Sequence, residues 1–305
     1  MNSKSTFKTV ILAAVAALSA IGAVFFYLGI SGEFEASLGY FVNNSSMAPI
    51  IYAILISGPV LGLVFSVSRR GTLSKNRSLP GNGKLPMRIL SAVLGLCIAV
   101  SAVLDFMSSM NGAPKEFASV IYISWVLAAL SFICLIRSAI VRENEASPLT
   151  CTVSFILPLF YASKVLVTYF DRTVAVNSPI QIICQLAFIS FMLTLTAETG
   201  IMLGRKKIYR RYLFTLCSSA VICSVFGLGS VICCVAGVDF FITWDTGAVM
   251  CASAAYAFLR LIFLSGYETE TAVADDVTAE PDAAEQAVGD ADENSESGED
   301  SKEEV

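Results

Sequence analysis

Histidine is absent from the 305-residue sequence. Without an imidazole the chain cannot build a Ser-His or Cys-His nucleophile pair, a bis-His haem site or a two-His zinc motif. The nine cysteines include no Cys-x-x-Cys spacing, and neither Walker A nor Gly-x-Gly-x-x-Gly occurs. The sequence therefore implies no metal and no cofactor. Acid-base catalysis would have to rely on Glu, Asp, Lys, Tyr and Cys alone. We therefore rank an enzyme below the two classes of function named at the end of this subsection.

Charge is scarce as well. Only 15% of the residues are charged, 55% are hydrophobic, and the mean hydropathy is +0.71. In soluble domains roughly a quarter of the residues are charged. The composition therefore predicts an integral membrane protein.

Apolar runs long enough to cross about 30 Å of hydrocarbon occur eight times along the chain. These runs predict an all-α, polytopic bundle of about eight transmembrane helices in a domain at 1–266. We expect the spans at 9–30, 48–67, 88–107, 117–136, 150–170, 180–203, 213–237 and 247–265. The first span follows two lysines but is longer than a secretory h-region of about 7–15 residues, so we predict an uncleaved anchor.

The connections between the expected spans alternate in charge. Basic residues precede the first span and follow the second, fourth and sixth, which by the positive-inside rule places both termini in the cytoplasm. We interpret the two largest basic clusters as topology signals that are also suited to anionic lipid headgroups. Because a membrane location already explains these charges, we expect no nucleic-acid binding. The clusters are Arg69, Arg70, Lys75, Arg77, Lys84 and Arg88, and Arg205, Lys206, Lys207, Arg210 and Arg211.

The C-terminal segment 267–305 differs from the rest of the chain. It carries 15 Asp/Glu and one Lys, a net charge of −14, whereas residues 1–266 carry +9. It has no apolar periodicity and contains Pro281, so it cannot bury enough surface to fold. We predict a disordered, acidic cytoplasmic tail. Such a tail is suited to a protein partner at the cytoplasmic face.

Charged groups inside expected spans are costly and often mark function. Lys164 in the fifth span shares a helical face with Tyr161, and Gln181 shares one with Gln185 in the sixth. Our hypothesis is a pocket in which Lys164 attracts an anionic group while Gln185 or Tyr161 orients it. The structural alternative is that Lys164 reaches the outer interface and pairs with Asp171 or Asp105.

Glu198 and Arg260 are the other two candidates. Each lies five or six residues inside the cytoplasmic end of its span, so an intramembrane ion pair between them is a second hypothesis. In the structural alternative, Arg260 extends to the headgroups and Glu198 bonds to Thr194 one turn earlier. The sequence leaves both interpretations open.

A stretch in the middle of the chain resembles a family of uncharacterised multispanning membrane proteins of Gram-positive anaerobic bacteria. The likeness covers about 50 residues. It implies an eight-span layout and a bacterial cell membrane, and it transfers no substrate or catalytic residue. It is carried by Tyr161-Ala162-Ser163-Lys164, Tyr169-Phe170-Asp171-Arg172, Ser178-Pro179-Ile180, Ala197-Glu198 and Arg205-Lys206-Lys207.

Two classes of function follow from these observations. The first is a small-molecule or ion permease, or the membrane subunit of a transporter, with a site among spans five, six and eight. The second is a membrane scaffold or sensor that recruits a partner through the acidic tail or the basic cytoplasmic loops. The matched depths of the intramembrane polar residues favour the first, and the charge of the tail favours the second.

Overall fold

The computed structural model divides the chain into two units, Met1–Tyr267 and Glu268–Val305, and the arrangement below concerns the first. Side chains are described from residue 7 to residue 264 within the described ranges. The structure describes residues 3–68, 79, 81–110, 118–141, 154–171, 178–203, 205, 208–238 and 243–278.

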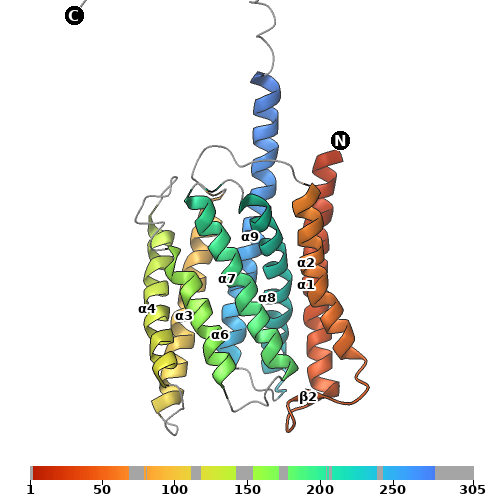
Figure 1. Ribbon diagram of the computed structural model, residues 1–305, viewed down its shortest axis with the longest axis vertical. Helices are drawn as coiled ribbons and strands as arrows, with labels where there is room; N and C mark the ends of the chain where they lie inside the picture. The colour runs from red at the N-terminus through yellow and green to blue at the C-terminus, as the bar shows by residue number, and fades with distance from the viewer. Residues whose placement is uncertain are drawn as a thin grey trace, which may run out of the picture. The chain divides into compact units, whose positions relative to one another are not determined.

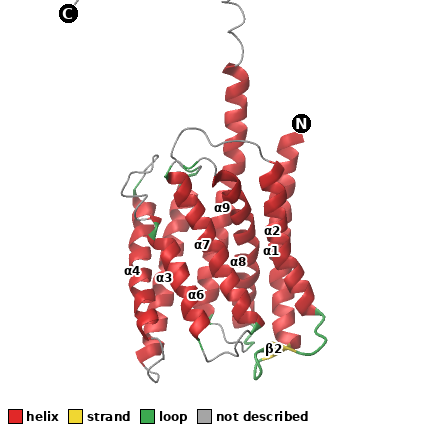
Figure 2. Ribbon diagram, viewed as in Figure 1, coloured by secondary structure: helices red, strands yellow, loops and turns green. Residues whose placement is uncertain are grey.

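Eight α-helices account for nearly all of the described chain, which confirms the all-α prediction (Figures 1 and 2). Their interiors are apolar because a membrane offers no water to backbone N–H and C=O groups, which a helix satisfies internally. A two-stranded antiparallel hairpin, β1 (Phe34–Glu35) and β2 (Tyr40–Phe41), joins the first two helices. The helices are α1 (Ser3–Glu33), α2 (Met47–Ser68), α3 (Leu85–Met110), α4 (Ala118–Ile140), α6 (Ile156–Phe170), α7 (Pro179–Met202), α8 (Tyr209–Val235) and α9 (Trp244–Thr278).

Seven of these helices are long and apolar enough to span a membrane, and α6 is the short one. Its 15 residues rise only about 22 Å. The expected fifth span began at residue 150, but 150–153 lie outside the described residues and the helix begins at Ile156. Pro158 therefore lies in the first turn, where amides have no intrahelical acceptor, so it does not interrupt the hydrogen-bond ladder of α6.

The last helix continues beyond its expected span. We placed the end of the span at residue 265 and the start of the tail at 267, whereas α9 continues to Thr278. The remainder of the predicted tail, 279–305, lies outside the described residues. So do 69–78 of the first basic cluster, and Lys206 and Lys207 of the second.

Helix α8 connects two parts of the bundle. It packs against α1 and α2 on one side and against α7 on the other, while α3, α4, α6 and α7 follow one another as a row. Glycines allow the closest approaches: a Cβ on Gly62 of α2 would lie 2.6 Å from the Phe214 carbonyl oxygen of α8, and one on Gly227 of α8 would lie 2.6 Å from the Cys251 amide of α9. Gly58 and Gly62 of α2 therefore both lie on the face that packs against α8.

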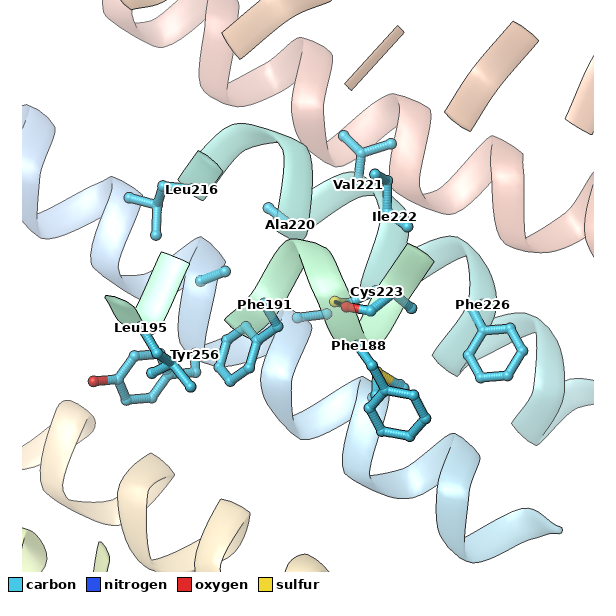
Figure 3. Packing of buried hydrophobic residues seen from close by; sticks show 14 of the residues in the cluster. Phe188, Phe191, Leu195, Leu216, Ala220, Val221, Ile222, Cys223, Phe226 and Tyr256 are labelled. Carbon is cyan, nitrogen blue, oxygen red and sulfur yellow. Dashed lines mark hydrogen bonds between the residues drawn. The ribbon is translucent and has the colours of Figure 1, made fainter. Parts of the chain in front are cut away.

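Helix α9 lies among α3, α6, α7 and α8. Its side chains bond to residues of the first three, and its backbone meets α8 at Gly227. Figure 3 shows the apolar part of this core, where Phe188 and Phe191 of α7 lie beside Cys223 of α8. The Phe191 and Tyr256 rings meet edge to face with centroids 5.9 Å apart.

The helices alternate in direction, so their ends gather at two faces of the bundle (Figure 1). We call these faces the basic end and the acidic end, after the described charges close to each. The basic end carries Lys8, Lys84, Arg88, Arg137, Arg205, Arg210 and Arg211. The acidic end carries Glu33, Glu35, Asp105, Asp171 and Asp245, with Lys164.

Candidate functional site

Two cavities lie among the same five helices, α3, α4, α6, α7 and α9, one toward each end of the bundle. The larger, at the acidic end, has a volume of about 310 Å³. Every one of the five helices contributes a lining residue. These include Asp105 of α3, Trp125 of α4, Lys164 of α6, Gln181 of α7 and Asp245 of α9.

Lys164 in this cavity has a carboxylate partner on the neighbouring α3. Its Nζ lies 2.5 Å from Asp105 Oδ2, and the exposed fractions of the two side chains are 10% and 38%. Asp171 and Asp245 also line the cavity, so three carboxylates face one ammonium group. An anionic solute would have to displace Asp105 to reach Lys164, whereas a cationic group would meet a net negative charge.

Asp245 is a lining residue that the sequence did not single out. It lies in the first turn of α9, where the helix dipole stabilises an anion, and it is 3% exposed. Ser101 Oγ of α3 donates to its Oδ2 at 2.6 Å. The available signal was its position as an acidic residue two positions before the expected span 247–265.

Of the other three residues of the predicted ligand pocket, only one lines the acidic-end cavity. Gln181 lines the acidic-end cavity, and its Nε2 donates to the Thr168 carbonyl at 2.5 Å, which ties α7 to α6. Tyr161 is fully buried below that cavity and shares a 2.6 Å hydrogen bond with Ser253 of α9. Gln185 is half-buried and lines neither cavity. Lys164 and Gln181 thus line the same cavity, whereas Tyr161 and Gln185 do not line it.

The cavity at the basic end is smaller, about 110 Å³. Four charged side chains line it: Arg88 of α3, Arg137 of α4, Glu198 of α7 and Arg260 of α9. Hydroxyl groups complete much of the polar wall, among them Ser91, Ser138 and Tyr256. The sum of these charges is positive, opposite to that of the other cavity.

Glu198 and Arg260 form an ion pair in the buried wall of this cavity. Arg260 Nη2 lies 2.6 Å from Glu198 Oε1, and the two side chains are only 5% and 4% exposed. Tyr256 OH donates to the same oxygen at 2.9 Å and accepts from Arg260 Nη2 at 3.1 Å. Thr194 instead donates to Ser190 and Ser219, so it is not the partner of Glu198.

The second oxygen of Glu198, Oε2, is buried and has no hydrogen-bond partner among the described residues. A buried acceptor left without a donor costs about 1–3 kcal/mol, and more when it is charged. Glu198 is also one of the lining residues of the cavity.

Aromatic side chains separate the two cavities. Phe188 lines the acidic-end cavity and Leu195 the basic-end cavity, seven residues apart on α7, or about 10 Å along the helix. Between them Phe191 and Tyr161 are fully buried, with ring centroids 4.9 Å apart. We call this layer of Phe191 and Tyr161 between the cavities the septum. The hydrogen bond between Tyr161 and Ser253 links the septum to α9.

Within the part of the chain that the structure describes, no three His, Cys, Asp or Glu side chains lie close enough together to hold a metal ion. The described cysteines are all free thiols. The polar chemistry of the core therefore consists of ion pairs, hydroxyl groups and amides.

The helices define a multi-pass membrane protein. Comparison of the sequence with models of known families, with curated proteins and with solved structures finds no match. The family resemblance from the middle of the chain thus stays a prediction.

Proposed function

We propose that this protein is a permease for a small molecule or ion. The observation that carries the proposal is the pair of cavities, which lie in line among five helices and are separated by a septum of about 10 Å. A path of this kind lets a solute enter from one side, and a small rearrangement of the septum opens it to the other. No described residue of α1, α2 or α8 lines either cavity, so these helices are suited to serve as the support.

The orientation that we propose follows from the charges at the two ends. The described basic residues gather at the end where α1 begins, and the positive-inside rule assigns that end to the cytoplasm. Both termini would then be cytoplasmic, in a cell membrane, with the basic end against anionic lipid headgroups.

The test is solute release from proteoliposomes. Vesicles loaded with a mixture of small amino acids, carboxylates, amines and sugars are diluted, and the retained solutes are measured by mass spectrometry. Thr246→Trp places a large ring in the acidic-end cavity, which Thr246 lines. Thr196→Trp is the matched control, because Thr196 is exposed on α7 and lines neither cavity.

We expect faster loss of at least one solute with the natural chain and with Thr196→Trp, and retention with Thr246→Trp. Retention of every solute by the natural chain, or equal loss from both variants, would reject the permease proposal.

A scaffold or sensor is the second candidate, favoured by the −14 charge of residues 267–305. A partner of this kind would bear a basic surface. Native mass spectrometry of the protein in native lipid discs, with and without residues 267–305, distinguishes the two. A stoichiometric second polypeptide that is lost with the tail, together with unchanged solute retention, would support the scaffold.

A further inference from the structure

Resting on the proposed permease function, we infer that the transported solute is a small zwitterion, and that the basic-end cavity holds its ammonium group at Glu198 Oε2 and its carboxylate at Arg88 and Arg137. The inference starts from the buried carboxylate. Glu198 is 3% exposed, its Oε1 already accepts from Arg260 and Tyr256, and its Oε2 has no hydrogen-bond partner among the described residues. A ligand that donates a hydrogen bond would satisfy it.

A simple cation is a poor match for the same cavity. Arg88, Arg137 and Arg260 all line it, so an ammonium group at Glu198 without an anion beside it would meet a net positive charge. Arg88 Nε and Nη2 donate to the carbonyls of Ala139 and Ile140, which uses two of the five N–H groups of its guanidinium. The remaining donors suit a carboxylate.

The acidic-end cavity points to the same class of solute. Its charged lining is Asp105, Asp171, Asp245 and Lys164, a net negative set, whereas the lining of the basic-end cavity is net positive. An ion of either sign would be attracted by one cavity and repelled by the other. A zwitterion carries a favourable group for each.

The size of the cavity limits the solute. An engineered cavity of about 150 Å³ holds benzene, so a cavity of about 110 Å³ admits a solute of about six non-hydrogen atoms or fewer. Glycine, alanine and β-alanine are within this limit. Propionate and ethylammonium have the two charged groups of alanine on separate molecules.

Binding to the full chain tests the inference. Discs of phosphatidylglycerol are used, because this lipid has no ammonium group that could occupy the cavity. Glycine, L-alanine, D-alanine, β-alanine, propionate and ethylammonium are titrated one at a time by calorimetry. We expect at least one of the four zwitterions to bind. Propionate and ethylammonium should each bind more weakly than that zwitterion by a factor of about ten or more.

Variants locate the binding. Ser138 lines the basic-end cavity and has no hydrogen bond to either member of the ion pair, so Ser138→Phe should fill the cavity and abolish binding. Glu198→Gln should weaken zwitterion binding by a factor of about ten or more and leave propionate unchanged. Arg211→Gln, an exposed arginine at the basic end outside the cavity, is the control and should retain binding. Ser138→Phe keeps the test decisive even where Glu198→Gln does not fold.

The outcomes separate the two proposals. Propionate binding as tight as that of the zwitterions, zwitterion binding that survives Ser138→Phe, or no binding of any zwitterion would overturn the inference. If a zwitterion binds as expected but is not released from vesicles, the cavity assignment stands and the permease proposal fails. If the vesicles release only solutes of one charge sign, the permease proposal stands and the zwitterion assignment fails.

Discussion

The Glu198–Arg260 pair allows a quantitative prediction about stability. We consider Glu198→Leu, Arg260→Leu and the double variant. Both groups are at most 5% exposed in the side chain, so either single change leaves an uncompensated buried charge. We expect each to lower the free energy of unfolding by about 3–5 kcal/mol. The double variant removes both charges, so its free energy of unfolding should fall by less than that of either single variant. The coupling free energy between the two sites should therefore reach about 3 kcal/mol or more.

Reversible unfolding in mixed detergent micelles measures this coupling. A thiol-reactive dye reports the transition, because Cys184, Cys217 and Cys223 are buried in the fold and become reactive when it opens. The Lys164–Asp105 pair is the matched control: 38% of the Asp105 side chain is exposed, so water screens the pair and its coupling should stay below about 1 kcal/mol. Near-additive single effects at Glu198 and Arg260, or equal coupling in the two pairs, would refute the reasoning.

Three further predictions concern the septum, the helix contacts and the orientation. Tyr161→Phe removes the hydrogen bond to Ser253 and should lower the free energy of unfolding by about 0.5–1.5 kcal/mol in the same assay. An unchanged free energy of unfolding would show that this bond does not stabilise the septum. Gly62→Ala forces a methyl group against a carbonyl of α8 and should cost about 1–3 kcal/mol, whereas Gly32→Ala, with nothing within 4 Å, should cost far less. Alkaline phosphatase fused after residue 305 should be inactive and a copy inserted between α1 and α2 active, since the enzyme matures only outside the cytoplasm; the reverse pattern would invert the proposed topology.

The helices were predictable because a membrane leaves the backbone few choices. An apolar run of sufficient length has to become a helix, so the expected span 88–107 became Leu85–Met110 and 117–136 became Ala118–Ile140. Most of the helices are longer than their expected spans, because polar residues continue a helix beyond the hydrocarbon. Only α6 came out shorter than expected.

The candidate site was predictable only where depth along a helix determines it. A rise of about 1.5 Å per residue placed Glu198 and Arg260 at one level, and the structure shows them in contact. The lateral order of helices was not predictable, because all eight runs are similarly apolar. Asp245 therefore went unassigned, since its place in a cavity depends on α9 lying beside α3, and Asp105 was only one of two alternative partners for Lys164.

The partners of α8 have a consequence for how the chain is assembled during synthesis. The α1–α2 hairpin packs chiefly on α8, and Ser19 bonds to a carbonyl 201 residues later, at Ala220. From the end of α2 at Ser68 to the end of α8 at Val235, a ribosome working at about 5–20 residues per second needs roughly 10–30 s. During that interval the hairpin is in the bilayer without its main partner, held by the α1–α2 contact and by the Glu33 carboxylate, which accepts from the Met47 amide at 3.0 Å. The emergence of α8 is thus the step that joins the early and late parts of the bundle.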